Sequence, residues 1–301
     1  MIPESVLPSY DEADLPENVR VWIYGTGARG RSARARIASL RPDVTVEGYL
    51  DSFQEGMVDG LPVRLPERLI RDWDFGLVLI ASTFMSVMYV HLHGLGFPMG
   101  SVAAYAIDED FTPRSAMVSR DHGFMYVPVT KVAHTSFRRA FAPYCPQGAE
   151  NVDLRSPEWN GLYKFAFVRN PFDRLVSCYA KQRKSKYQAL LRVVLGESHG
   201  FGDFVRFVAG MKDGASDPHW ASQSLTLCDG QDNVLVDDVF RFEDIPSALE
   251  TLRRSRGIEV DMPWHNASRR AAYADYYGPE ERDIVARRYG RDLSAFGYRF
   301  D

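Results

Sequence analysis

Residues that commonly bind anions follow an apolar segment near the middle of the chain. Residues 124–127 are strand-like, and the turn after them leads into a helix predicted at 135–141. Lys131 lies in the turn, and Thr135 and Ser136 open the helix. A turn that feeds a helix N-terminus offers backbone N–H groups and a positive dipole end, and lysine and hydroxyl side chains add further donors. The pattern therefore predicts an anion site at this joint.

A second joint of the same kind lies about thirty residues further along the chain. The strand predicted at 164–168 is followed by Arg169, and Pro171 stands where the first residue of a helix is favoured. A helix that starts there places Arg174 and Ser177 on one face. Either joint alone could equally be a strand edge with a solvated lysine or a surface arginine. Together they predict two adjacent anion sites.

The two joints together resemble the phosphate-binding motifs of the sulfotransferases that use 3'-phosphoadenosine 5'-phosphosulfate (PAPS). The resemblance is closest to the carbohydrate-type family of Golgi enzymes and their bacterial relatives. Residues 168–179 match the second motif of that family, Val-Arg-Asn-Pro-Phe-x-Arg-Leu-Val-Ser-x-Tyr, almost letter for letter. The first motif departs from the family pattern, because Thr130 stands where a proline usually precedes the lysine and His134 replaces a small residue.

Three downstream segments extend the resemblance, which runs from about residue 121 to the C-terminus. They are similar to the family's His-Trp-x-Pro-Gln stretch, with Ser222 in place of the proline, to its strand with an Arg-x-Glu corner, and to its closing helix with Phe-Gly-Tyr. These segments are residues 219–228, 238–244 and 276–298. The resemblance implies a P-loop-NTPase-like sulfotransferase domain with a parallel sheet, which we place at residues 118–301.

The resemblance also implies roles for the two joints. In that family the first motif holds the 5'-phosphosulfate of the donor and the second holds the 3'-phosphate. Arg169 and Ser177 then bind the 3'-phosphate. The 5' end is bound by the run Lys131, Val132, Ala133, His134, Thr135 and Ser136. The implied reaction moves the sulfuryl group of PAPS to a hydroxyl of a sugar or polysaccharide, or of a small alcohol, and leaves adenosine 3',5'-bisphosphate.

Sulfuryl transfer resembles phosphoryl transfer, so the protein mainly positions the reactants for in-line attack and offsets developing charge. A sulfuryl group carries one negative charge less than a phosphoryl dianion. We therefore expect Lys131 and backbone N–H donors to suffice without a metal ion. No pair of aspartates is placed as a metal site.

The acceptor hydroxyl needs a base that titrates near neutrality, and histidine is the usual choice. We expect the base to be His219, which has Trp220 beside it to shape a pocket. The alternatives are His122, which precedes a strand and lies at its opposite end, His134, which a bound anion would hold cationic, and His265. Glu243 is better explained as the partner of Arg241 in an ion pair at a corner.

The first part of the chain carries a second glycine pattern. A strand at 19–24 precedes Gly25-x-Gly27-x-x-Gly30, a helix follows, and the next strand ends at Asp51. This order is typical of a dinucleotide-type βαβ unit, so we expect a small Rossmann-like α/β domain over residues 1–110. Binding of a nucleotide by Gly25, Gly27, Gly30 and Asp51 and an accessory role both stay open, and the accessory role is preferred. The boundary is expected at the polar segment 108–115.

Composition limits the remaining possibilities. The 301 residues are 45% hydrophobic, enough for two cores, and 36 basic against 40 acidic residues give a net charge of −4. This balance gives no general attraction to nucleic acid, although the basic run 181–186 could serve a polyanionic glycan or be a solvated helix face. The three cysteines are widely spaced and indicate reduced thiols; they are Cys145, Cys178 and Cys228.

The N-terminus has no basic leader region, and no apolar run reaches the length of a membrane span. We therefore expect a cytoplasmic enzyme of the bacterial type. The sequence gives no oligomeric state. Three rival functions remain: a P-loop kinase or nucleotidase, although the Walker pattern is absent; an NAD-dependent oxidoreductase that uses the first domain; and a non-enzymatic glycan-binding protein.

Overall fold

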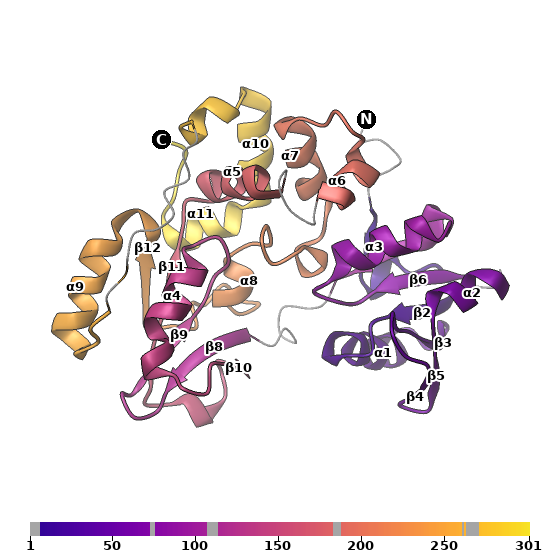
Figure 1. The fold of residues 1–301 in the computed structure, drawn as a ribbon, viewed down its shortest axis with the longest axis horizontal. Helices are drawn as coiled ribbons and strands as arrows, with labels where there is room; N and C mark the ends of the chain where they lie inside the picture. Colours follow the sequence, from indigo (N-terminus) through magenta and orange to yellow (C-terminus); the bar gives the residue numbers. More distant parts are fainter. Residues whose placement is uncertain (1–6, 73–75, 107–113, 183–187, 261, 263–270) are drawn as a thin grey trace. The chain divides into compact units, whose positions relative to one another are not determined.

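The computed structural model describes residues 7–72, 76–106, 114–182, 188–260, 262 and 271–301. Packing divides the chain into two compact units, each with a sheet and helices (Figure 1). Unit 1 comprises residues 1–112 and 179–221, and unit 2 comprises residues 113–178 and 222–301. The expected α/β class is confirmed. The domain limits 1–110 and 118–301 remain predictions, and residues 179–221 pack with unit 1.

Unit 1 contains a seven-stranded sheet in the order β1-β7-β6-β2-β3-β5-β4. Every neighbouring pair is parallel except β4 with β5. The strands are β1 Ser9–Tyr10, β2 Arg20–Tyr24, β3 Thr45–Leu50, β4 Gly56–Val58, β5 Leu61–Arg64, β6 Leu77–Ile80 and β7 Val102–Tyr105. The helices are α1 Ala28–Leu40, α2 Pro66–Asp72, α3 Met85–Gly94, α6 Gln188–Leu195 and α7 Phe201–Gly210.

Unit 2 contains a five-stranded sheet in the order β10-β8-β9-β11-β12. The strands are β8 Arg114–Ser119, β9 Phe124–Val127, β10 Ala149–Val152, β11 Tyr163–Val168 and β12 Asp238–Arg241. The helices are α4 His134–Phe141, α8 Ser224–Leu227, α9 Ile245–Arg256, α10 Pro279–Arg288 and α11 Gly290–Phe296. Helix α5, Pro171–Gln182, begins in unit 2 and continues into unit 1.

The sheet of unit 2 contains the expected parallel strands together with antiparallel ones, so it is mixed. Strands β9, β11 and β12 are parallel as expected, but β8 is antiparallel to β9 and to β10. The reason is local: only the turn at 120–123 joins β8 to β9, and a connection this short can form only a hairpin. The three parallel strands nevertheless carry both predicted joints at their carboxyl ends.

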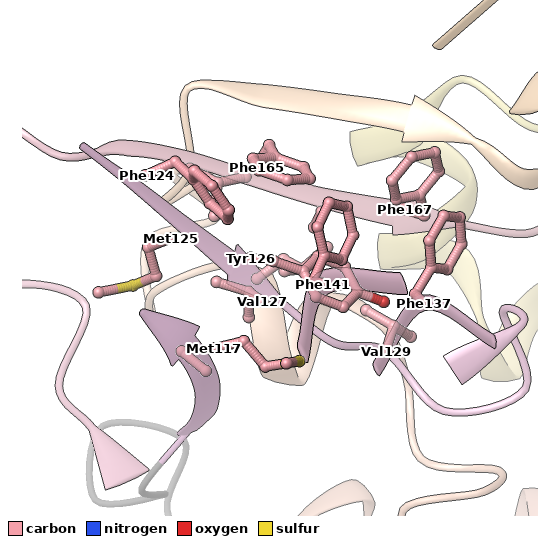
Figure 2. Packing of buried hydrophobic residues seen from close by; sticks show 14 of the residues in the cluster. Met117, Phe124, Met125, Tyr126, Val127, Val129, Phe137, Phe141, Phe165 and Phe167 are labelled. Atoms are coloured by element: carbon pink, nitrogen blue, oxygen red, sulfur yellow. The ribbon is translucent and has the colours of Figure 1, made fainter. Parts of the chain in front are cut away.

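An aromatic core fixes helix α4 on the sheet of unit 2 (Figure 2). Phe137 and Phe141 lie one turn apart on α4, so both reach the same face of the sheet. Phe137 stacks on Phe167 of β11 at 4.1 Å between centroids, and Phe141 lies 4.9 Å from Tyr126 of β9. Each buried phenylalanine contributes about 1.5–3 kcal/mol. This packing places the N-terminus of α4 just beyond the end of β9.

Candidate functional site

The carboxyl ends of three parallel strands meet at one edge of the unit 2 sheet. Strand β9 ends at Val127, which pairs with Ala166, and β11 ends at Val168, which pairs with Arg241 of β12. The segments that leave these strands therefore start side by side. Ligands of open α/β sheets bind at this kind of edge.

The turn between β9 and α4 has an unusual backbone. Lys131 and Ala133 have φ angles of 68° and 45°, so two residues that are not glycine adopt the left-handed conformation. Such residues cost of order 1–3 kcal/mol each and cluster at functional sites. Val132 between them is fully buried. In turns whose residues alternate between left-handed and ordinary backbone, successive N–H groups can converge on one point and form an anion-binding nest.

Helix α4 begins at His134, one residue before the predicted start, with Ala133 as its N-cap. Alanine has no side-chain oxygen to accept from the first-turn N–H groups, and the first helical bond runs from Phe137 N–H to the Ala133 carbonyl. Thr135 is exposed and Ser136 is half-buried in this first turn. The predicted 5' run thus forms one continuous turn and helix start.

Lys131 joins the first turn to the second joint. Its Nζ donates a hydrogen bond to the main-chain oxygen of Ser177 in α5, at 2.9 Å. Ser177 itself is half-buried on that helix. Two predicted site residues that are 46 positions apart in sequence are therefore neighbours in unit 2.

Arg169 lies directly after β11 and is only 9% exposed. Its Nε and Nη2 donate to the Asp173 carboxylate at 2.8 and 2.5 Å, and its Nη1 donates to the Lys131 carbonyl at 3.2 Å. The guanidinium also lies 4.4 Å from the ring centre of Phe242. Three of its five N–H donors are engaged in these bonds, which leaves two for an anion.

Arg174 lies on α5 three residues before Ser177, and the sequence pattern predicted both on one helix face without giving Arg174 a role. It is 2% exposed, and its Nε and Nη2 donate to the main-chain oxygen and the hydroxyl of Thr130, at 3.1 and 3.3 Å. Thr130 stands where the related motif has proline, and here its hydroxyl is used as an acceptor. The two arginines thus hold consecutive carbonyls of the first turn.

At the corner after β12, Arg241 and Glu243 have other partners in place of the expected ion pair. Arg241 donates to the carbonyls of Phe296 and Gly297 at 3.1 and 2.8 Å. Glu243 instead accepts from the Asn170 N–H and the Tyr298 hydroxyl, both at 2.8 Å. The strand ends at Arg241 and a 3-10 turn follows, so the two side chains no longer share a strand face.

His219 belongs to unit 1, whereas Lys131, Arg169 and Ser177 belong to unit 2. Its Nδ1 lies 2.7 Å from Oδ1 of Asp217, which also accepts from the His219 main-chain N–H at 2.9 Å. The Asp217 side chain is 2% exposed and that of His219 is 29% exposed. Sequence reasoning missed Asp217, although an aspartate two residues before a histidine is a recognisable signal for such a turn.

The other candidate bases have different surroundings. His122 precedes β9 as expected, with its Nδ1 3.0 Å from the Ser119 hydroxyl and its ring edge-on to Tyr144. His134 is the first residue of α4 and is half-buried. His265 lies outside the described residues, as does most of the basic run 181–186.

The glycine pattern of unit 1 connects β2 to α1, as predicted. Gly25 has a φ of 126°, and a Cβ on it would lie 2.8 Å from the Ala81 carbonyl oxygen. A Cβ on Gly30 would lie 1.8 Å from the Gly25 carbonyl oxygen, whereas Gly27 has open space around it. Asp51 follows β3 and accepts a 2.9 Å hydrogen bond from the Thr26 hydroxyl. Close backbone packing alone therefore requires two of the three glycines.

The remaining predicted features concern metals, thiols and membranes. Among the described residues no group of three potential ligands is placed to hold a metal ion. The three cysteines are buried and form no disulfide. Burial raises the pKa of Cys145 and of Cys228 to about 11. In the described parts of the chain, no helix combines the length and the hydropathy that a membrane crossing requires.

A family model described as the sulfotransferase family covers residues 114–299, which contain β8 to β12 and both joints. No curated protein and no solved structure matches the chain.

Proposed function

The chain belongs to the sulfotransferase family and is a sulfotransferase enzyme, and from this premise we propose that it transfers the sulfuryl group of PAPS to a hydroxyl of a sugar or polysaccharide. A family member of this kind needs a donor site and a hydroxyl-bearing acceptor. The donor has two separated anionic ends, the 5'-phosphosulfate and the 3'-phosphate. Two anion sites in one unit would suit such a donor.

The observation that carries this proposal is the pair of hydrogen bonds between the two joints. Arg169 donates to the Lys131 carbonyl, and Lys131 donates to the Ser177 carbonyl, so both joints form one connected surface at one sheet edge. In the proposal, Arg169 and Ser177 take the 3'-phosphate. The 5' end lies on the nest and first turn formed by Lys131, Val132, Ala133, His134, Thr135 and Ser136.

The residues present fit such a donor at both ends. At the 5' end, a nest with an uncapped helix start offers backbone N–H donors, and Lys131 adds a charge. At the 3' end, Arg169 keeps two N–H donors after its bonds to Asp173 and the Lys131 carbonyl. Donors fixed in this way lose little freedom when an anion binds.

In the proposed reaction, the acceptor oxygen forms a bond to sulfur while the bond from sulfur to the bridging phosphate oxygen breaks. Lys131 offsets the charge that grows on this leaving oxygen. The sulfuryl group carries one negative charge less than a phosphoryl dianion, so we propose that no metal ion is needed. The products are the sulfated acceptor and adenosine 3',5'-bisphosphate.

We propose that the acceptor's proton moves to His219. The Asp217 carboxylate can only accept hydrogen bonds, so the Nδ1 atom 2.7 Å away carries the proton and Nε2 is the basic nitrogen. Asp217 thereby selects the tautomer that a general base requires. The half-exposed position of His219 beside a buried carboxylate supports this role.

We also propose a domain type for each unit from its fold. In unit 2, a strand, an anion-binding turn and a helix in succession support a P-loop-NTPase-like domain. In unit 1, the strand order β5-β3-β2-β6-β7 is that of a doubly wound sheet, which supports a Rossmann-like domain. Because packing accounts for Gly25 and Gly30, we propose an accessory role for unit 1.

Binding and transfer together test the proposal. Calorimetry of the wild-type protein should show tighter binding of adenosine 3',5'-bisphosphate than of adenosine 5'-phosphate, which lacks the 3'-phosphate. Labelled PAPS should then deliver its sulfuryl group to members of a panel of sugars, polysaccharides and small alcohols, in the presence of a metal chelator. Equal affinity for the two nucleotides, or stronger binding of ATP with Mg²⁺, would refute the donor assignment.

A further inference from the structure

The side chain of Gln223 pairs with both main-chain groups of Arg169. Its Oε1 accepts from the Arg169 N–H at 2.9 Å, and its Nε2 donates to the Arg169 carbonyl at 2.8 Å. Gln223 is fully buried. The bonds run in opposite directions, so only one orientation of the amide satisfies both. A single side chain thus replaces a β-strand partner for this residue.

Gln223 pairs with Arg169 just beyond the last backbone hydrogen bonds of the sheet. On one side of β11 the ladder to β9 ends at the pair Ala166–Val127, because the chain after Val127 leaves for the anion-binding turn. On the other side the ladder to β12 ends at Val168–Arg241. Arg169 is the next residue, and its buried main-chain groups need other partners. Gln223 supplies them.

Asp292 in turn holds Gln223. The carboxylate lies in α11, is fully buried, and accepts from the main-chain N–H groups of Gln223 and Ser224 at 2.9 and 2.8 Å. It also accepts from Gln223 Nε2 at 3.3 Å. Burial raises the pKa of Asp292, and the charge of Arg174 acts in the opposite direction. A buried carboxylate is costly to keep, so its donors are arranged around it closely.

These contacts lead from Asp292 through Gln223 to the guanidinium of Arg169. With its main chain fixed by Gln223, Arg169 extends its side chain over Phe242 and against Asp173 and the Lys131 carbonyl. A shift of the main chain would move every one of these contacts. Groups that bind an anion must be held within roughly 0.5 Å of their productive positions.

We propose that Gln223, held by Asp292, is a positioning residue that sets the place of Arg169 for the 3'-phosphate of the donor. The inference rests on the proposed function, because it assigns a task to Arg169 in donor binding. Gln223 does not touch the donor in this scheme. Its contribution is the fixed main chain from which the guanidinium reaches the phosphate.

The test compares two nucleotides that differ only in the 3'-phosphate. Gln223→Met keeps the length of the side chain but removes both hydrogen bonds to Arg169. We expect its affinity for adenosine 3',5'-bisphosphate to fall roughly tenfold or more, as for other supporting residues, while that for adenosine 5'-phosphate stays within about twofold. A purely structural role would instead lower the melting temperature and leave the preference for the 3'-phosphate unchanged.

Ser222→Ala is the matched control. Ser222 is also buried in this segment, and its hydroxyl accepts from Arg288 Nη1 at 3.1 Å. This variant should keep the wild-type nucleotide preference. If Gln223→Met does not fold, Asp292→Asn takes its place, since it loosens Gln223 but leaves its amide present, and it should show the same selective loss.

The outcomes separate the inference from the proposed function. A wild-type protein without preference for the 3'-phosphate would refute the donor assignment itself. A wild-type protein with that preference, retained in folded Gln223→Met or Asp292→Asn, would overturn the positioning role alone.

Discussion

The Nζ atom of Lys131 donates a 2.9 Å hydrogen bond to the main-chain oxygen of Ser177, so the charge of the first joint is directed at the helix of the second. A lysine on a turn is usually solvated and mobile. Here the left-handed backbone of Lys131 and this bond fix both ends of the side chain. An ammonium group held in this way needs little reorganisation to meet a developing charge, and that is the main source of electrostatic catalysis.

Removal of this charge should therefore affect turnover more than binding. For Lys131→Met we expect kcat for sulfuryl transfer to fall about 10²–10³-fold, because the leaving oxygen loses its cation. Steady-state kinetics with labelled PAPS would measure it. Arg139→Met, which removes an exposed cation from α4, is the control and should behave like the wild type. A Lys131→Met variant with unaltered kcat would exclude Lys131 from the reaction.

Arg169 should determine binding of the 3'-phosphate. We expect Arg169→Ala to weaken adenosine 3',5'-bisphosphate by about 1.5–3 kcal/mol, the usual value of a hydrogen bond to a charged group. Calorimetry would measure the dissociation constant. Arg120→Ala removes another arginine of unit 2, whose partner is Glu150, and should leave this constant unchanged. Unchanged affinity in Arg169→Ala would mean that the side chain only holds the Lys131 carbonyl and Asp173.

The pair of His219 and Asp217 should control the proton transfer. We expect His219→Ala to lower kcat about 10²–10⁴-fold, with little change in nucleotide affinity. Asp217→Asn should also lower kcat, because an amide facing Nδ1 no longer selects one tautomer. His122→Ala is the control, since this ring packs against Ser119 and Tyr144. Full activity of His219→Ala would require a different base, whereas full activity of Asp217→Asn would refute only the selection of the tautomer by Asp217.

The joints were predictable because their signals are local. Apolar runs of four to six residues, a proline at the start of α5 and paired phenylalanines on α4 all act over a few residues, and both helices begin within one residue of the prediction. The hairpin of β8 and β9 was missed. Its short turn is equally local, but no strand was predicted at residues 114–119, most of which follow the expected boundary segment 108–115.

The residues that hold Arg169 in place could not be predicted from local signals, because they are far from it in the sequence. Gln223 is 54 residues from Arg169, and Asp292 is 69 residues from Gln223. Gln223 lies in the segment that resembles the family's His-Trp-x-Pro-Gln stretch, but no periodicity or turn signal connects it to Arg169 or to Asp292. The place of residues 179–221 in unit 1 is likewise decided by packing between distant segments.

The contribution of an ion pair in unit 1 to stability should depend on pH. Arg41 donates from Nε and Nη2 to both oxygens of Asp43, at 2.9 and 2.7 Å, and from Nη1 to the carbonyls of Glu12 and Leu15. The bond from Arg41 lowers the pKa of Asp43 from 3.8 to about 2. A carboxylate whose pKa is lowered by folding stabilises the folded state at pH values above its ordinary pKa. This stabilisation is lost as the pH falls toward the lowered pKa.

Thermal unfolding should therefore show Asp43→Asn less stable than the wild type at pH 7, and the difference in stability should close between about pH 4 and pH 2. Asp72→Asn, which breaks the exposed pair with Arg64, should give a small gap at every pH. An Asp43→Asn gap that stays constant down to pH 2 would show that the charge of Asp43 contributes nothing to holding the N-terminal segment on α1.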